Sequence, residues 1–338
     1  MLETKYTYTI VGAGLSGLVT AYELLKSGED DFIILEARDR VGGRILTDKN
    51  IDLGATWLQT YHTTLLHLLE ELNLKTFEQY SEGQSVLVYS SMSPAHYFEM
   101  DKSQPSSKRI VGGTLALINA LRDKLHHKIK LNMKVMSVQE KDAGILLHTE
   151  SSDILSEKVV ITLPPLLASE INFSPSLPIE VIEAMEGTHT WMSNAIKVGI
   201  TFKEPFWRAK GLSGTVIGQA SPVVELYDHS NYENSVFVLK GFVNESLREL
   251  CAEERKHRIL KFLEEYLGKE VKDYLLYTEK DWSTDVFTAG AQLKSYYLSP
   301  QYGNPVFQKM YFNSKLLFSG TESSENYGGY LEGAVLSG

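Results

Sequence analysis

Cysteine is almost missing from this sequence: Cys251 is the single one among 338 residues. One cysteine excludes an intrachain disulfide framework and is typical of a reducing compartment, so we expect a cytoplasmic protein. Cys251 lies in the helix-like stretch SLRELCAEERKHRILKFLEEYLG, where we expect it to be buried by packing. The nine histidines show no spacing typical of metal ligands, and we therefore predict no metal site.

Long hydrophobic runs and an excess of positive charge are missing as well. No apolar stretch approaches the ~20 residues that a membrane helix needs. The first strand-like run begins within six residues of Met1, so we expect no signal peptide. The net charge of −10 argues against nucleic acid or an anionic membrane as a partner. A chain of 338 residues is too long for one core, which favours two domains.

Glycine is concentrated instead near the start, where GAGLSG follows the β-branched and aromatic run at 6–11. Gly12 permits a tight turn, Gly14 permits close approach of a pyrophosphate, and Gly17 permits close packing of a helix on the strand. A helix that begins there points its free N–H groups and positive dipole end at the phosphates. Glu36 ends the next apolar strand, nineteen residues after Gly17, where a carboxylate can accept hydrogen bonds from a ribose. The pattern predicts a dinucleotide site.

A second glycine pair indicates which dinucleotide is bound. The stretch EARDRVGGR runs from Glu36 through Gly42 and Gly43 to Arg44. A nicotinamide enzyme has no need of this second pair and arginine. FAD is longer, so a second backbone approach and a cation near its phosphates or ribityl chain favour FAD. We interpret Arg40 as part of a solvated basic turn.

The remaining segments predict an α/β fold in two parts. The stretch at 65–72 and VGGTLALINALRDKL are helix-like, 128–163 alternates like a β-meander, and NAIKVGITF and SVFVLKGFV are strand-like. Residues 246–276 are again helix-like, and the end of the chain returns to glycine-rich turns. We therefore predict a Rossmann-like FAD-binding domain whose pieces bracket a sheet-plus-helix substrate domain. The predicted pieces are 1–78, 109–186 and 285–338 for FAD, and 79–108 and 187–284 for substrate.

These residues carry a family resemblance. The stretches GAGLSG, EARDRVGGR, DLGATWL, VGGTLALINAL, VVITLPP, KVGITFKEPFW and GTESSENYGGYLEGA make the chain similar to the flavin-containing monoamine and polyamine oxidases, which are GR2-type flavoproteins. The resemblance implies an FAD-dependent amine oxidase. A neutral amine gives a hydride from its α-carbon to flavin N5, and the resulting imine hydrolyses. Oxygen then reoxidises the reduced flavin and is itself reduced to hydrogen peroxide. The implied FAD-binding residues are Gly12, Gly14, Gly17, Glu36, Arg38, Gly43, Arg44, Val135, Glu322 and Leu331.

The resemblance also implies residues beside the reacting atoms. Lys197 matches a lysine that holds a water next to flavin N5; the alternative is a strand-end lysine that faces solvent. Trp282 matches a tryptophan that packs near the flavin, although core packing alone would explain it. Tyr330 matches one of two aromatic rings that guide the amine, but the other position is Gln292, an amide without a π-face. Ala291 stands where some relatives bond FAD through cysteine, so the FAD is expected to be non-covalent.

Two departures from the family leave the substrate open. The single matched ring puts simple amine substrates in doubt. The excursion at 83–108 is far shorter than the family's helical insert, which predicts a more open pocket or one covered by a partner subunit, as in a homodimer. A related FAD enzyme, such as a desaturase or an amino-acid oxidase, and a non-catalytic FAD-binding scaffold stay as alternatives. An amino-acid oxidase would use an arginine to clamp a carboxylate, where the stretch after Gly54 offers Trp57.

Overall fold

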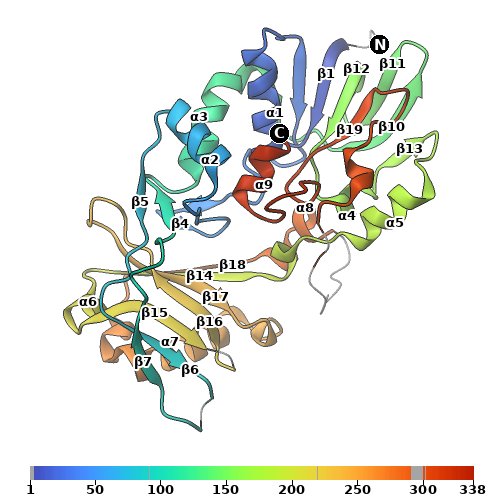
Figure 1. Cartoon of the computed structure of the whole chain (residues 1–338). Helices are drawn as coiled ribbons and strands as arrows, with labels where there is room; N and C mark the ends of the chain where they lie inside the picture. Colours follow the sequence, from blue (N-terminus) through green and yellow to red (C-terminus); the bar gives the residue numbers. More distant parts are fainter. Residues whose placement is uncertain (1–3, 91, 219, 291–299, 301) are drawn as a thin grey trace.

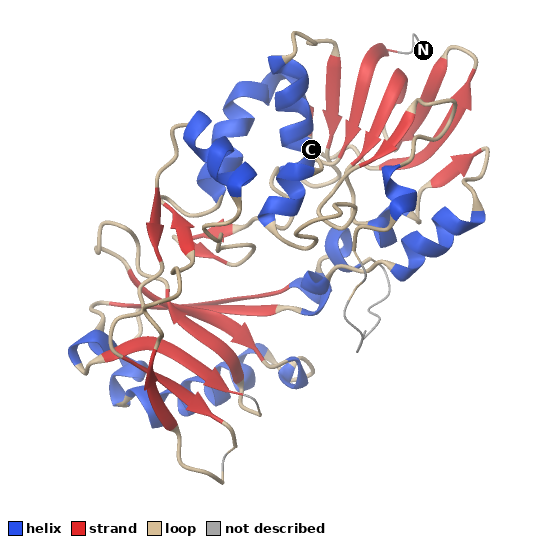
Figure 2. Cartoon of the chain, in the orientation of Figure 1, coloured by secondary structure: helices blue, strands red, loops and turns tan. Residues whose placement is uncertain are grey.

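Two large β-sheets lie at opposite ends of the molecule in the computed structural model, which describes residues 4–90, 92–218, 220–290, 300 and 302–338 (Figure 1). Figure 2 shows helices packed around each sheet and loops joining the two halves. Within the described residues, one sheet has eight strands and the other has seven.

The first sheet has the order β13-β10-β11-β12-β1-β2-β9, and β19 pairs with β12 beside β1. Strands β2, β1, β12 and β19 run parallel to one another, whereas β12, β11 and β10 form an antiparallel meander. The bounds are β1 (Thr4–Val11), β2 (Phe32–Leu35), β9 (Ile129–Lys130), β10 (Val135–Lys141), β11 (Gly144–Thr149), β12 (Asp153–Ile161), β13 (Asn172–Ser174) and β19 (Leu316–Phe318).

Both faces of the parallel strands are covered, as a buried parallel sheet requires. Helices α1 (Leu15–Lys26), α2 (Thr63–Glu71), α3 (Leu115–Leu125) and α9 (Leu331–Leu336) share one apolar cluster with alternate residues of β1 and β2, such as Ile10 and Ile34. On the other face Val11 and Ile33 pack with the meander and with α5 (Ile179–Gly187). The two clusters alternate along each strand because successive side chains point to opposite faces.

The second sheet has the order β18-β14-β17-β16-β15-β6-β7. Helix α7 (Ala252–Leu267) buries Ile259, Leu263 and Leu267 against it. In Figure 1, β14 and β18 extend from this sheet toward the first one. The strand bounds are β6 (Gln84–Val88), β7 (His96–Glu99), β14 (Ile196–Phe202), β15 (Leu212–Gly218), β16 (Val223–Asp228), β17 (Phe237–Val243) and β18 (Leu276–Asp281).

Short elements connect the two halves. Two small sheets pair β3 (Thr47–Asp48) with β4 (Ile51–Asp52), and β5 (Thr76–Glu78) with β8 (Lys108–Ile110). The short α-helices are α4 (Pro165–Ala168), α6 (Phe206–Ala209) and α8 (Val286–Ala289). The 3₁₀ turns are η1 (His126–Lys128), η2 (Trp191–Asn194), η3 (Glu245–Leu247), η4 (Lys269–Asp273), η5 (Trp282–Thr284) and η6 (Pro305–Gln308).

Most predicted elements are present, and one local prediction is wrong. The strands of the first sheet fall inside the segments predicted to bind FAD, while the β5–β8 sheet crosses the predicted boundary; the domain limits themselves stay a prediction. Cys251 is exposed and not buried, because it caps the N-terminus of α7 instead of lying on its packed face. Across the described segments, no helix combines the length and hydrophobicity needed to cross a membrane.

Candidate functional site

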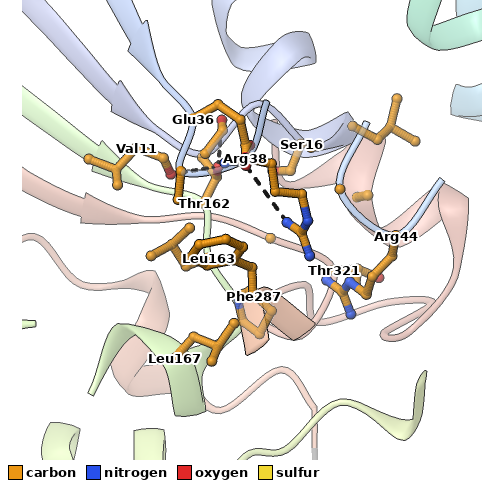
Figure 3. A pocket seen from close by; sticks show the side chains of 18 of the residues that line it. Val11, Ser16, Glu36, Arg38, Arg44, Thr162, Leu163, Leu167, Phe287 and Thr321 are labelled. Atoms are coloured by element: carbon orange, nitrogen blue, oxygen red, sulfur yellow. Dashed lines mark hydrogen bonds and ion pairs between the residues drawn. The ribbon is translucent and has the colours of Figure 1, made fainter. Parts of the chain in front are cut away.

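A cavity of about 480 Å³ opens where the parallel strands of the first sheet end. The carboxyl ends of parallel strands are where α/β sheets bind ligands. Figure 3 shows side chains from the ends of β1, β2 and β12 meeting residues of the C-terminal segment around one space. The predicted site residues that line the cavity are Gly12, Gly14, Glu36, Arg38, Gly43, Arg44, Val135, Tyr330 and Leu331.

The glycine turn at one end of the cavity fits a pyrophosphate. Gly12 has φ +109, a backbone conformation that favours glycine, and Gly14 caps the N-terminus of α1 without any side-chain hydrogen bond. The first N–H groups of a helix have no intrahelical acceptor and are available to an anion. A Cβ added to Gly14 would meet no protein atom within 4 Å, although Gly14 lines the cavity. The space in front of Gly14 is therefore available to a ligand.

Gly17 has a different role, since it does not line the cavity. A Cβ at this position would collide with the Gly12 carbonyl oxygen and come within 2.9 Å of Thr162 Oγ1. Gly17 therefore allows helix α1 to lie directly on the turn after β1, which is the packing role predicted for it. Any effect of Gly17 on a cofactor is indirect.

Glu36 lies at the end of β2 with only 4% of its surface exposed. Its Oε2 accepts a hydrogen bond from the Ala13 backbone N–H at 2.8 Å, and its Oε1 accepts one from the Arg38 N–H at 2.9 Å. These bonds fix the carboxylate against the glycine turn. Each oxygen keeps a further lone pair that could accept from a ribose hydroxyl.

The arginines of EARDRVGGR are held by protein partners. Arg38 donates to Asp285 Oδ1 at 2.7 Å and to Thr288 Oγ1 at 3.0 Å, which ties the first segment to α8. The interpretation of Arg40 as a solvated turn residue is wrong. Its half-buried guanidinium donates to three carbonyl oxygens of the turn, among them Gly43 O at 2.8 Å. Burial lowers the pKa of Arg40, with repulsion from Arg38 adding to this effect.

Arg44 forms a two-bond ion pair with Glu322. Arg44 Nη2 donates to Glu322 Oε2 at 2.9 Å, and Nη1 donates to Glu322 Oε1. Nη1 also donates to Thr190 Oγ1 at 2.6 Å. Burial lowers the pKa of Arg44, but the charge and hydrogen bonds of Glu322 outweigh burial and raise the pKa above its ordinary value. Glu322 is fully buried and does not line the cavity, so it orients Arg44, which does.

Lys197 lies behind the cavity wall and not in it. Its side chain is only 1% exposed, and Nζ donates to Gly54 O and lies 4.6 Å from the centroid of the Phe242 ring. The alternative of a solvent-facing lysine is therefore wrong. Burial lowers the pKa of Lys197 to about 7, against an opposing effect of Asp52.

Trp282, a further predicted residue, does not reach the cavity surface. Trp282 is fully buried beside Met192 and Ala195, and its Nε1 donates to Leu53 O at 2.8 Å, as core packing requires. Gln292 and Ala291 lie outside the described residues.

Two residues near the predicted catalytic lysine belong to no motif in the sequence. Trp191 lines the cavity, and its only sequence signal is an aromatic residue shortly before NAIKVGITF. Lys240 is a second fully buried lysine, whose Nζ donates to Thr56 Oγ1 and lies 4.0 Å from the Trp57 ring centroid. Burial and the charge of Lys197 lower the pKa of Lys240 well below its ordinary value. The sequence around Lys240 gave no indication that this lysine is buried close to Lys197.

This chain is similar to known proteins along most of its length. The family model described as "Flavin containing amine oxidoreductase" matches residues 15–93 and 85–338. Amine oxidase [flavin-containing] B of Sus scrofa is 25% identical over 451 aligned positions, which cover 100% of this chain and 85% of that protein. Putrescine oxidase of Kocuria rosea is 26% identical, with coverage of 85% and 84%.

Solved structures confirm the fold. Wild-type putrescine oxidase bound to putrescine superimposes with a TM-score of 0.87 at 25% identity, covering 99% of this chain and 97% of that one. Cyclohexylamine oxidase from Brevibacterium oxydans gives a TM-score of 0.86 at 19% identity, covering 98% and 96%, and supports the fold alone. The predicted α/β architecture with a Rossmann-like FAD-binding part is therefore correct.

The alignments with relatives are longer than this chain. The alignment with the Sus scrofa protein runs over 451 positions, more than a hundred beyond the 338 residues of this chain. The two stretches matched by the family model overlap at 85–93, inside the excursion predicted at 83–108. In the described residues this excursion contains β6 and β7, at the edge of the second sheet.

Proposed function

The chain belongs to the family of flavin containing amine oxidoreductases, and on that premise we propose that it oxidises a primary amine with an apolar substituent. Its relatives are flavin-containing amine oxidases, and the chain is an FAD-dependent oxidoreductase of amines. Bound FAD supplies the ring system that accepts the hydride from the amine α-carbon. The residues of this chain bind and orient the two reactants and exclude water.

The cavity fits FAD along its length. The glycine turn and the N-terminus of α1 would hold the pyrophosphate, and Glu36 would accept hydrogen bonds from the ribose. Val135 lines the cavity near the end of β2, where the adenine would lie. Arg44 would lie along the ribityl chain, because Glu322 holds its guanidinium at the cavity surface.

The far end of the cavity supports an amine with an apolar substituent. Next to Thr190, which accepts from Arg44, the lining includes Trp191 and Met192, and Ala55, Tyr330 and Leu331 also line the cavity. The glutamates of the C-terminal segment nearest this end are already bonded: Glu322 pairs with Arg44, and Glu332 accepts from the Thr64 and Leu65 N–H groups. Neither is offered to a second ammonium group, and the two glutamates that line the cavity, Glu36 and Glu170, follow β2 and α4. An apolar wall of this kind binds a substrate by burial of its hydrocarbon part.

The alternatives are less well supported. An amino-acid oxidase would need an arginine for the substrate carboxylate. The two cavity arginines considered above are each paired with a carboxylate, Arg38 with Asp285 and Arg44 with Glu322. A scaffold without catalysis gives no reason for Lys197, an ionisable group buried one side chain behind the cavity.

The observation that carries the proposal is that one cavity joins the glycine turn, Glu36 and Arg44 to an aromatic end formed by Trp191 and Tyr330. The test is to purify the chain with FAD and to measure hydrogen peroxide release over a panel of amines. Anaerobic bleaching of the flavin absorption is measured in parallel with amines, amino acids and polyenes. Bleaching and peroxide with apolar amines support the proposal. Bleaching only with an amino acid or a polyene would replace it with that alternative.

Two wider expectations are also proposals. We propose that the protein acts in the cytoplasm and that a second copy covers the open cavity. Size-exclusion chromatography with light scattering tests the dimer, and a monomeric FAD-loaded protein would contradict it.

A further inference from the structure

Trp191 presents an indole face to the cavity. It begins the 3₁₀ turn η2, lines the cavity and keeps 40% of its surface exposed. Large aromatic side chains are normally packed on both faces. An indole that is left open on a cavity wall is typical of a surface that binds a ligand.

The indole is held firmly by its surroundings. Its Nε1 donates to Gly329 O at 3.1 Å, its backbone N–H donates to the Tyr302 hydroxyl at 3.0 Å, and its ring lies 6.2 Å from the Phe242 ring. The indole has one donor, and Gly329 already uses it. The part of the ring that faces the cavity therefore offers only apolar and π contacts.

The same contact brings Trp191 and Tyr330 into one lining. Gly329 has φ +82, and a Cβ on it would come within 3.1 Å of Trp191 Cδ1, so its backbone lies directly against the indole. Tyr330 follows in sequence, lines the cavity and is 60% exposed. Two aromatic surfaces thus belong to one end of the cavity, although they are far apart in the sequence.

Lys197 adds a charge to this end. Its Nζ lies 5.9 Å from the Trp191 ring centroid, on the buried side of the wall. A substrate ammonium that docked on the indole would meet this like charge whenever Lys197 is protonated. An uncharged hydrocarbon or aryl group meets no such repulsion.

We propose that Trp191 determines substrate specificity: with Tyr330, its indole receives the apolar or aryl substituent of the amine and disfavours a substituent with a second charge. The inference rests on the proposed function and names the residue that selects the substrate. The competing explanation is that Trp191 only covers FAD, which makes no prediction about the substituent.

The test compares Trp191→Phe with Trp191→Leu in the FAD-loaded protein. Both side chains are apolar and smaller than indole, but only Phe keeps an aromatic face. Tyr232→Ala is the control, since Tyr232 is 54% exposed, packs on Phe77 and does not line the cavity. Each variant is assayed for the FAD dissociation constant and for KM and kcat with benzylamine and 1,4-diaminobutane. The dissociation constant of benzylamine is taken from the dependence of the anaerobic flavin-reduction rate on benzylamine concentration or, if benzylamine does not reduce the flavin, from the change in the flavin spectrum on binding.

The proposal predicts that Trp191→Leu raises KM and the dissociation constant for benzylamine about tenfold. Its preference for benzylamine over 1,4-diaminobutane should shrink, while FAD affinity changes less than threefold. Trp191→Phe should lose less than Trp191→Leu, and Tyr232→Ala should stay within threefold of wild type. A loss of FAD affinity with unchanged benzylamine binding would assign Trp191 to covering the cofactor and overturn the proposal.

The binding arm separates this inference from the proposed function. If wild type releases no peroxide and shows no bleaching with any amine, the proposed function fails. The inference then stands if wild type binds benzylamine and Trp191→Leu binds it about tenfold more weakly. Wild type that does not bind benzylamine at all would overturn the inference directly.

Discussion

Two glycines of the GAGLSG turn should respond in opposite ways to the same substitution. Gly14→Ala places a methyl group where no protein atom lies within 4 Å, and the φ of −73 is acceptable for alanine. Gly17→Ala places one against the Gly12 carbonyl oxygen and 2.9 Å from Thr162 Oγ1, well inside the 3.4 Å of ordinary contact. Gly14→Ala therefore narrows the cavity, whereas Gly17→Ala creates a steric clash within the folded protein.

The magnitudes follow from these contacts. Forcing a methyl group into a filled space costs about 1–3 kcal/mol, so apo Gly17→Ala should unfold roughly 2–10 °C below wild type. Apo Gly14→Ala should stay within about 1 kcal/mol of wild type. Losing one charge-assisted hydrogen bond to a phosphate costs about 1.5–3 kcal/mol, which weakens FAD binding by Gly14→Ala roughly 10- to 150-fold.

The assays are thermal unfolding of the apoprotein and titration of the apoprotein with FAD, followed by flavin fluorescence. Gly17→Ala is the matched control for Gly14→Ala, since each adds one methyl group to the same turn. If Gly14→Ala bound FAD as tightly as wild type, the pyrophosphate would not lie against the turn. If apo Gly14→Ala were as unstable as apo Gly17→Ala, the added methyl group would collide with the protein. That result would contradict the empty space in front of Gly14.

Three further predictions concern charge and attachment. Lys197→Met should lower kcat/KM for oxygen about tenfold at pH 6, where the lysine is protonated. Wild type should lose this rate advantage as the pH rises through about 7, and the pH profile of the variant should be flat there; a profile unchanged by the substitution would demote Lys197 to a structural residue. Glu322→Gln leaves Arg44 without its counter-charge. Because Arg44 is 22% exposed, the loss of stability should be at most the ~3–5 kcal/mol found when a fully buried ion pair is broken. Thermal unfolding measures this loss, and an unchanged melting temperature would contradict a stabilising role for the pair. Acid precipitation should leave the yellow colour in the supernatant, because Ala291 has no thiol to bond FAD, and a yellow pellet would contradict this.

The accuracy of the sequence analysis depended on the range of the interaction that it needed. The glycine turn, helix α1 and Glu36 lie within 25 residues, and local rules of turn geometry and helix capping determine them. The prediction that Cys251 is buried was wrong because the helix-like composition extends beyond the N-terminus of α7. The packed face of α7 begins only after Cys251, which caps the helix. The binding of Arg40 to three carbonyl groups was missed because charged composition alone suggests solvent.

The chemistry of the site depends on contacts that no local pattern contains. Arg44 is oriented by Glu322 from 278 residues away, and the Trp191 indole is oriented by Gly329 from 138 residues away. Family resemblance placed Arg44 and Glu322 in one site because both match motifs of known proteins, but it had no motif for Trp191. A residue that is particular to one chain becomes visible only when folding brings it to the cavity. Substrate choice within a family is therefore the property that sequence motifs predict least well, and the Trp191 variants test it most directly.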